Sequence, residues 1–377
     1  MGMIGGGPGA FIGSVHRTAA AMDGLSELIA GAFSSDPLKS EEKGEELNLS
    51  KSRVYGSFKE MIEKESRLPQ DERLDFVSIV TPNHLHFEPA KLALEKGFHV
   101  VVDKPMTFDL KEAFELKAVA ERSGKYFCIT HTYTGYPMIK EARQQIADGR
   151  LGKIRKILVN YPQGWLSSFL EGSHQKQAAW RTDPSRSGIA GAMGDIGSHA
   201  FNLAEYVSGL KVTKLCADIN VVVEGRQLDD DGAMLLKFEN GASGILVASQ
   251  VMSGEENNLQ IDVYGEKAGL SWKHSEANTL VIRNSDRPVE LLRAGTGYLS
   301  SFAKHNTRTP AGHPEGYLEA FANLYRNFIL CIQAQLNNQQ PEPEWLDFPN
   351  AEDGLRGMMF IQRAIESGRS DEKWLTM

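Results

Sequence analysis

The first 132 residues alternate between apolar, strand-like runs and amphipathic helices. The runs at 76–80 and 98–102 are apolar almost throughout, which is typical of strands covered on both faces. The predicted strands are 1–4, 27–33, 76–80, 98–102 and 126–130, and the predicted helices are 12–22, 57–64, 86–96 and 110–123. Strands separated by helices predict a doubly wound parallel sheet.

The pattern changes near residue 133, where one helix at 138–148 is followed mainly by strands. Turn-forming residues such as Glu239-Asn240-Gly241 join many of these strands, which favours antiparallel pairing. The strands are predicted at 154–161, 212–223, 233–238, 242–250, 259–264, 269–272 and 279–282, with two later helices at 314–335 and 350–367. We therefore predict an α/β protein of two domains: residues 1–132 hold the parallel sheet, and residues 133–377 form an α+β domain with a mostly antiparallel sheet.

Composition narrows the class of protein. The chain has 377 residues, 41% of them hydrophobic, which is enough for a large core. A net charge of -8 without a basic cluster argues against a nucleic-acid partner. Cys128, Cys216 and Cys331 have no zinc-site spacing and indicate buried thiols in a reducing compartment. No apolar run is long enough to span a membrane and no signal peptide is recognisable, so we expect a cytoplasmic location without a membrane partner.

A glycine-rich loop follows the first predicted strand. Its sequence, Gly5-Gly6-Gly7-Pro8-Gly9-Ala10, fits G-x-G-x-x-A between a strand and a helix. Glycine permits the tight turn and the close approach of a pyrophosphate, and the free N–H groups of the next helix favour an anion. The residues expected to bind a dinucleotide here are Gly5, Gly7, Ala10, Phe11 and Ile12. Two alternatives stay open: a purely structural loop, or a fingerprint whose third glycine is Gly13.

The beginning of the chain and the end of the second strand each leave a question open. Four residues precede the glycines, where a first strand usually has about five or six, so residues could precede Met1. NAD-specific sites usually carry an acidic residue at the end of the second strand, but Phe33 or Ser34 stands there. Ser34, Ser35 and Lys39 could contact a 2′-phosphate, and Asp36 could reach a ribose, so both NAD and NADP are retained.

Three further segments follow in order along the chain. They are Thr81-Pro82-Asn83-His84-Leu85-His86 after the run at 76–80, Asp103-Lys104-Pro105 after the run at 98–102, and Gly194-Asp195-Ile196-Gly197-Ser198-His199 in the second half. Together with the glycine loop, they resemble the glucose-fructose oxidoreductase / inositol dehydrogenase / MocA family (Gfo/Idh/MocA). The resemblance covers nearly the whole chain.

This resemblance implies a Rossmann domain and a second domain with an open antiparallel sheet, whose face supports a homodimer or homotetramer. Lys104 matches the lysine of the family's Glu-Lys-Pro motif, with Asp103 replacing the glutamate, and Asp195 and His199 match its Asp-x-x-x-His pair. The cofactor-binding residues that it implies are Thr81, Pro82, Asn83, His86, Lys104 and Pro105. Members often have an arginine near Thr134, so the substrate contacts at that point stay open.

The residues themselves suggest the chemistry. Oxidation of a secondary alcohol needs a base whose pKa lies near the working pH, and His199 is the natural candidate. Asp195 lies four residues earlier, so on a helix it shares a face with His199 and could fix the imidazole tautomer. Lys104 could polarise the reacting oxygen, bind the ribose or relay the proton. Lys104, Asp195 and His199 are therefore the candidate catalytic residues.

The pair Asp195 and His199 and the aspartate run 229–231 each allow another interpretation. Asp195 and His199 could form a surface pair or bind a metal, but no third ligand is evident, so we predict no metal site. The run Asp229-Asp230-Asp231 could bind a cation, although a solvated loop fits better.

Aromatic and polar residues in the second half suit a sugar or cyclitol. The candidate substrate-binding residues are Tyr161, Trp180, Arg181 and His313. We predict an NAD(P)-dependent oxidoreductase that transfers a hydride between the nicotinamide and a secondary hydroxyl or keto group of a sugar, cyclitol or similar polyol. Two alternatives remain: an NAD-dependent non-redox reaction such as glycoside cleavage through transient oxidation, and a non-catalytic NAD(P) sensor.

Overall fold

The computed structural model describes residues 1–173 and 175–377, apart from the side chain of residue 176. The chain divides into two units. Unit 1 comprises Met1–Thr132 and Tyr317–Leu355, and unit 2 comprises Tyr133–Gly316 and Arg356–Met377. The segment Tyr317–Leu355 was expected in the second domain but lies in unit 1. Its helix carries a broad apolar face that packs on the first sheet.

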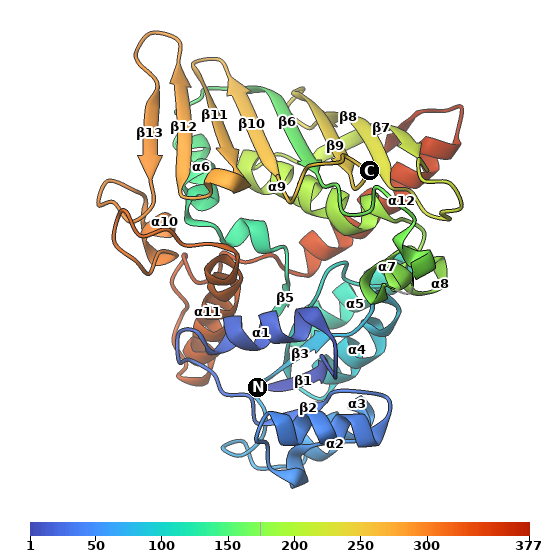
Figure 1. Ribbon diagram of the computed structural model, residues 1–377. Coiled ribbons are helices and arrows are strands. Elements are labelled where there is room, and N and C mark those ends of the chain that lie inside the picture. The colour runs from blue at the N-terminus through green and yellow to red at the C-terminus, as the bar shows by residue number, and fades with distance from the viewer. Residues whose placement is uncertain (174) are drawn as a thin grey trace. The chain divides into compact units, whose positions relative to one another are not determined.

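Unit 1 contains a five-stranded sheet with the order β2-β1-β3-β4-β5, and every pairing in it is parallel (Figure 1). This confirms the predicted doubly wound sheet. Its strands are β1 (Gly2–Gly5), β2 (Ala30–Ala32), β3 (Phe76–Val80), β4 (His99–Val102) and β5 (Phe127–Ile129). Its helices are α1 (Phe11–Ala21), α2 (Pro37–Glu46), α3 (Phe58–Glu65), α4 (Phe87–Glu95), α5 (Leu110–Ser123) and α11 (Tyr317–Leu336).

The direction of winding reverses at β1, which lies between β2 and β3. Ligands of open α/β sheets bind at the carboxyl ends of the strands beside such a reversal. In unit 1 those ends lead into the glycine loop after β1 and into Thr81 after β3. The fold therefore places two of the predicted cofactor segments at one edge of the sheet.

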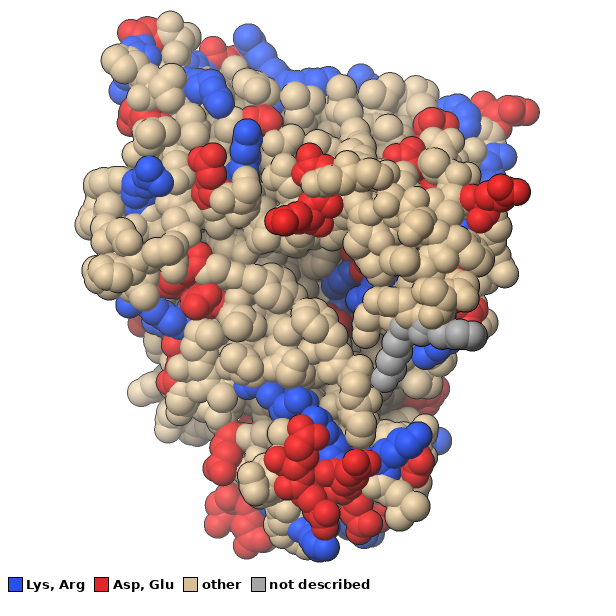
Figure 2. Space-filling view, viewed as in Figure 1, with Lys and Arg blue, Asp and Glu red and all other residues tan. Residues whose placement is uncertain are grey.

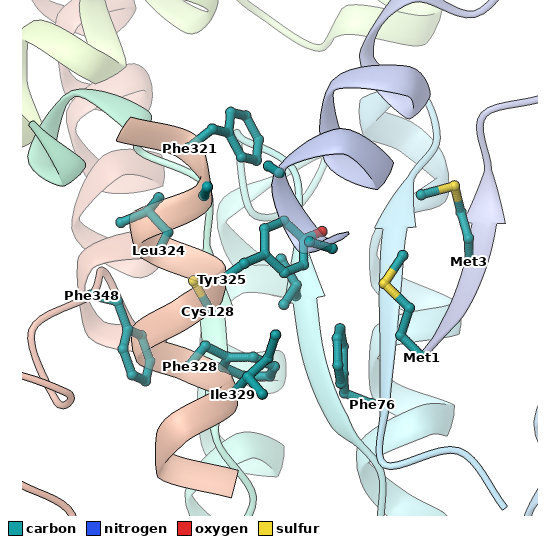
Figure 3. Packing of buried hydrophobic residues seen from close by; sticks show 14 of the residues in the cluster. Met1, Met3, Phe76, Cys128, Phe321, Leu324, Tyr325, Phe328, Ile329 and Phe348 are labelled. Carbon is teal, nitrogen blue, oxygen red and sulfur yellow. The ribbon is translucent and has the colours of Figure 1, made fainter. Parts of the chain in front are cut away.

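Helices α1 and α11 pack together on one face of this sheet, and their apolar side chains form one buried cluster with the strands (Figure 3). Phe328 of α11 is fully buried, with its ring edge-on to Phe76 of β3 at a centroid distance of 5.4 Å. Right-handed crossovers place helices on the opposite face once the winding reverses, and α4 and α5 contact each other there. The sheet is thus covered on both faces.

Unit 2 contains a nine-stranded sheet with the order β13-β12-β11-β10-β6-β9-β8-β7-β14. Its strands are β6 (Ile154–Pro162), β7 (Val212–Asn220), β8 (Asp231–Phe238), β9 (Ser243–Ser249), β10 (Gln260–Gly265), β11 (Ala268–Lys273), β12 (Thr279–Asn284), β13 (Glu290–Arg293) and β14 (Trp374–Thr376). Its helices are α6 (Pro137–Ala147), α7 (Lys176–Arg181), α8 (Pro184–Ser187), α9 (Ser198–Ser208), α10 (Ser301–His305) and most of α12 (Ala351–Arg369).

The second sheet is open and mostly antiparallel, as predicted. Among the described residues of this sheet, the pairing of β6 with β9 is the one parallel pairing between neighbouring strands. Helices α6 and α9 pack against one face (Figure 1), and burial alternates along β8 as a sheet covered on one face requires. Within the described part of the chain, no helix combines the length and the apolar character needed to cross a membrane.

Candidate active site

The loop after β1 is a turn that only glycine can form. Gly5, Gly6 and Gly9 have φ values of +88°, +72° and +73°, in the left-handed region that favours glycine. A Cβ on Gly7 would lie 2.7 Å from the carbonyl oxygen of Phe33, and a Cβ on Gly13 would lie 2.6 Å from the Cα of Gly6. Gly13 is thus the glycine that lets α1 approach the turn closely, which supports the alternative fingerprint.

The start of α1 faces this turn with its N–H groups available. Ala10 occupies the N-cap position without a side-chain cap, and the first turn carries no acidic residue. The first N–H groups of a helix have no intrahelical acceptor, and the helix dipole adds a partial positive charge at this end. This arrangement suits the pyrophosphate of a dinucleotide, and Phe11 and Ile12 are the first residues of the helix at this end.

Polar groups follow β2, where an adenosine ribose is held in folds of this type. The N–H of Asp36 donates to the hydroxyl of Ser34 at 3.1 Å, and the Asp36 carboxylate caps α2 by accepting from Leu38. Lys39 lies 3.7 Å from Asp36. The lysine that could attract a 2′-phosphate is therefore already close to a carboxylate.

His86 connects the two remaining cofactor segments of unit 1. Its ring nitrogens lie 2.8 Å from the carbonyl oxygen of Pro105 and 2.8 Å from that of Thr81. Burial lowers the pKa of this imidazole. Because the ring bridges the loops after β3 and β4, it fixes Lys104 and Pro105, joined by a cis peptide bond, relative to Thr81. Pro82 and the buried Asn83 lie in the same turn.

A buried polar cluster supports the residue before Lys104. Thr130 donates to the Asp103 carboxylate at 2.6 Å, and Nε2 of His16 lies 3.8 Å from it. Nδ1 of His16 contacts the Tyr325 hydroxyl at 2.7 Å. Burial alone would raise the pKa of Asp103, but His16 and Thr130 hold it below its ordinary value. Asp103 thus remains ionised and anchors the loop that carries Lys104.

In unit 2, Asp195 and His199 lie on successive turns of one helical segment. Asp195 belongs to the π-helical turn Met193–Gly197, which continues directly into α9, where His199 is buried. The Asp195 carboxylate accepts a hydrogen bond of 3.0 Å from Gln250, and Nε of Arg181 lies 3.5 Å from the same oxygen. The His199 ring stands edge-on to Tyr133, with 5.2 Å between centroids.

A continuous hydrogen-bonded array extends from Asp195 through unit 2. Gln250 also donates to Gln163 at 3.2 Å, and Gln163 donates to Asn257 at 2.7 Å. The hydroxyl of Tyr161 donates to Asn257 at 2.8 Å and contacts the hydroxyl of Tyr133. Donors and acceptors in such a row can recognise the hydroxyl groups of a polyol.

Three of the four predicted substrate residues lie in or beside this array, and the fourth, His313, lies in a separate segment of unit 2. Tyr161 and Arg181 belong to this array, and Trp180 stacks against the Arg181 guanidinium at 4.4 Å. His313 lies in an exposed segment before α11, where its carbonyl oxygen accepts from Thr309.

Sequence reasoning missed Gln250, Asn257, Tyr133 and His274 as members of the array. Gln250 had a usable signal, because it is a polar residue at the carboxyl end of the strand predicted at 242–250. Asn257 lies in an irregular loop and had none.

Comparisons with known proteins agree with this architecture. The chain matches the family model "Oxidoreductase family, NAD-binding Rossmann fold" over residues 1–131 and the "GFO/IDH/MocA C-terminal domain" over residues 139–271. YfiI of Bacillus subtilis (strain 168), an uncharacterized oxidoreductase, is 30% identical, covering 99% of this chain and 95% of that protein. A solved oxidoreductase from Sinorhizobium meliloti is 42% identical with a TM-score of 0.89, covering 99% of this chain and 98% of that one.

An inositol dehydrogenase homolog from Azotobacter vinelandii, solved with NAD+, has a TM-score of 0.93 and 34% identity, covering 100% of this chain and 96% of that one. The fold and the glycine turn therefore define an NAD-binding oxidoreductase with a Rossmann domain. The chain belongs to the Gfo/Idh/MocA family.

A methyl group at residue 7 tests the glycine turn. In Gly7→Ala the new Cβ would lie 2.7 Å from the Phe33 carbonyl oxygen, so the turn must shift, and we expect the affinity for NADH to fall at least about tenfold. Gly56→Ala is the matched control, because its Cβ meets other atoms only at ordinary contact distances of 3.5 Å or more. Fluorescence titration with NADH measures both variants. Wild-type affinity in Gly7→Ala would contradict this account.

Proposed function

We propose that this protein is an NAD-dependent dehydrogenase that oxidises a secondary hydroxyl group of a cyclitol, sugar or related polyol. The observation that carries the proposal is the array that joins Asp195 to Gln250, Gln163, Asn257 and Tyr161 in a chain with an NAD-binding Rossmann domain. This array offers both donors and acceptors. It therefore suits a substrate with several hydroxyl groups, since each hydroxyl can both donate and accept a hydrogen bond.

The proposed roles follow from residue chemistry. Bound NAD supplies the hydride acceptor. His199 takes the proton of the reacting hydroxyl, because a neutral imidazole has a ring nitrogen that can accept a proton and this side chain is buried. Asp195 is held by Gln250 and Arg181 and orients the substrate and the imidazole. Lys104 stabilises negative charge on the reacting oxygen, and Asp103 fixes the loop on which it stands.

Two relatives support the substrate class. The inositol dehydrogenase homolog from Azotobacter vinelandii was also solved with NADH and myo-inositol, at 33% identity and a TM-score of 0.91. A levoglucosan dehydrogenase is 24% identical over 93% of this chain. Both named ligands present ring hydroxyl groups, which the array in unit 2 could hydrogen-bond.

Charge around the end of β2 supports NAD over NADP. Lys39 lies close to Asp36, and α2 carries four glutamates. Figure 2 shows acidic side chains gathered over the part of the surface that α2 forms. A 2′-phosphate would add negative charge beside Asp36 and the glutamates of α2, whereas the two ribose hydroxyls of NAD carry no charge.

The exposed face of the unit 2 sheet supports assembly into a homodimer or homotetramer. Apolar side chains occupy matching positions on neighbouring strands: Trp374 pairs with Cys216, Cys216 with Leu235, Leu235 with Ile245, and Ile245 with Leu158. Leu235 is 48% exposed and Ile245 37% exposed. A contiguous apolar stripe of this kind marks a protein interface. No disulfide joins the described cysteines Cys128, Cys216 and Cys331, which also supports a cytoplasmic location.

A substrate screen tests the activity and the cofactor together. We expect NADH formation with myo-inositol or another cyclitol or sugar, and a kcat/KM at least about tenfold higher with NAD than with NADP. The panel includes levoglucosan, glucose and the corresponding keto compounds in the reverse direction, followed by absorbance of the reduced nicotinamide. Product formation without net NADH would instead indicate the non-redox reaction, and no turnover with any polyol would contradict the proposal.

Two substitutions test the proposed catalytic roles. His199→Asn and Lys104→Met should each lower kcat by about 10²- to 10⁴-fold, because each removes a group that exchanges a proton with the reacting oxygen or stabilises its charge. Lys111→Met, at an exposed position of α5, is the control and should retain wild-type kcat. Steady-state kinetics with the best substrate of the screen measures all three. Wild-type kcat in either active-site variant would rule out its role.

Charges on the apolar stripe test the assembly. Leu235→Asp combined with Ile245→Asp should convert the oligomer to a monomer, because it buries two charges of the same sign, which cannot pair with each other, in the proposed interface. Leu38→Asp is the matched control, since Leu38 is 75% exposed on α2 of unit 1 and should not affect assembly. Light scattering after size-exclusion chromatography gives the masses. A monomeric wild-type protein would contradict this part of the proposal.

A further inference from the structure

Three consecutive aspartates precede and begin β8, where the sequence favoured a solvated loop. The structure contradicts that expectation. Asp229 is 5% exposed and Asp230 is fully buried, whereas Asp231 is only partly covered and contacts Asn220. Buried carboxylates are costly unless hydrogen bonds or opposite charges compensate them. The hydrogen-bond partners of Asp229 and Asp230 should therefore explain why two adjacent carboxylates are buried.

Asp229 holds the backbone turn that leads into Asp195. One carboxylate oxygen accepts the N–H of Gly191 at 2.6 Å, and the other accepts the N–H of Met193 at 2.7 Å. The carbonyl oxygen of Asp229 accepts the N–H of Ala192 at 2.8 Å. Three successive N–H groups before the π-helical turn thus bind one residue. The next contact in the chain is the N–H of Asp195, which donates to the Gly191 carbonyl at 2.9 Å.

The backbone at Gly191 already lies as close to Asp229 as sterics allow. A Cβ on Gly191 would lie 2.1 Å from the Asp229 carbonyl oxygen, so the two backbones are in direct contact. Gly191 is therefore required because its Cα approaches the Asp229 backbone while its N–H group binds the Asp229 carboxylate. Any displacement of Asp229 would be transmitted to the π-helical turn Met193–Gly197.

Asp230 holds Gln250, the residue that donates a hydrogen bond to Asp195. Its carbonyl oxygen accepts the N–H of Gln250 at 2.8 Å, and Gln250 donates its side chain to Asp195. Its carboxylate accepts from Arg226 at 3.0 Å, and Arg226 also donates to the carbonyl oxygens of Leu166 and Ser168. The pair Asp229-Asp230 thus fixes both Asp195 and the residue that hydrogen-bonds it.

We propose that Asp229 is a positioning residue, whose carboxylate fixes the turn that sets the geometry of Asp195 relative to Gln250 and Arg181. The kinetic part of this inference rests on the proposed role of Asp195 in polyol oxidation, whereas the anchoring of the turn does not. A carboxylate is required because both of its oxygens face N–H donors, which an amide can satisfy on one side only.

The protonation state of the Asp229 carboxyl is consistent with this role. Burial raises its pKa to about 6, against the opposing effect of the Met193 and Gly191 N–H groups. The carboxyl is thus ionised near neutral pH, where it accepts both N–H groups, although the buried charge costs stability. Asparagine removes that charge and one hydrogen bond together. The two effects oppose each other, so Asp229→Asn should remain folded.

Hydrogen exchange measures the anchoring without reference to activity. In Asp229→Asn we expect the amides of Gly191 and Met193 to exchange at least about tenfold faster than in the wild type, because one N–H loses its acceptor and the other binds an uncharged amide oxygen in place of a carboxylate. Asp231→Asn is the matched control, with the same substitution two residues away, and should exchange at the wild-type rate. Unchanged exchange in Asp229→Asn would overturn the inference while leaving the proposed function intact.

Kinetics with myo-inositol, or with the polyol of the screen that gives the highest rate, measures the consequence. Asp229→Asn should lower kcat about tenfold to a hundredfold without changing the affinity for NADH, which binds through unit 1. In an Asp195→Asn background the same substitution should cause no further loss, because Asp229 acts through Asp195. Multiplicative losses in the double variant would overturn the positioning role.

Two further results separate the possible failures. If Asp195→Asn retains wild-type kcat, the proposed role of Asp195 fails and the kinetic part of the inference fails with it, whatever the exchange rates show. If Asp229→Asn does not accumulate as folded protein, Gly191→Ala tests the same contact with the carboxylate intact. Its methyl group would displace the turn from Asp229, so we expect the same loss of kcat, and a wild-type kcat would overturn the inference.

Discussion

The functional elements of both units depend on one steric constraint, the direct contact of two backbones at a turn that leaves no room for a side chain. At the first turn, a Cβ on Gly13 would lie 2.6 Å from Gly6, and at the second a Cβ on Gly191 would lie 2.1 Å from the Asp229 carbonyl oxygen. The first contact brings the start of α1 to the end of β1, where N–H groups can bind a pyrophosphate. The second contact ties the Asp195 turn to the start of β8.

Hydrogen-bonded carboxylates then fix the loop after β4 that carries Lys104 and the turn that carries Asp195. Asp103 is held by Thr130 and His16 beside Lys104, and Asp229 is held by backbone N–H groups before Asp195. Each carboxylate is expensive to bury and is stabilised by several donors, so its position is well determined. A carboxylate held by several donors thus occurs both beside the parallel sheet and beside the mostly antiparallel one.

Periodicity predicted most of the fold. The apolar runs of β3 and β4 and the helix α5 were placed within a residue or so, because their patterns are unambiguous. Helix α2 was missed, since its polar sequence has no apolar stripe and its start is defined by the Asp36 cap. The return of α11 to unit 1 depends on tertiary packing that no local pattern contains. Motifs located Asp195 and His199, but Asn257 and the anchoring role of Asp229 depend on contacts between distant segments.

The central claim is that this family member oxidises a polyol by net transfer of a hydride to NAD, and isotope transfer tests it most directly. The protein is incubated with NAD and myo-inositol, or the best substrate of the panel, that carries deuterium on its ring carbons, and the nicotinamide is examined by mass spectrometry. The account predicts one deuterium in each NADH formed, in a one-to-one ratio with the keto product. Product formed with its deuterium retained and with no labelled NADH would contradict it.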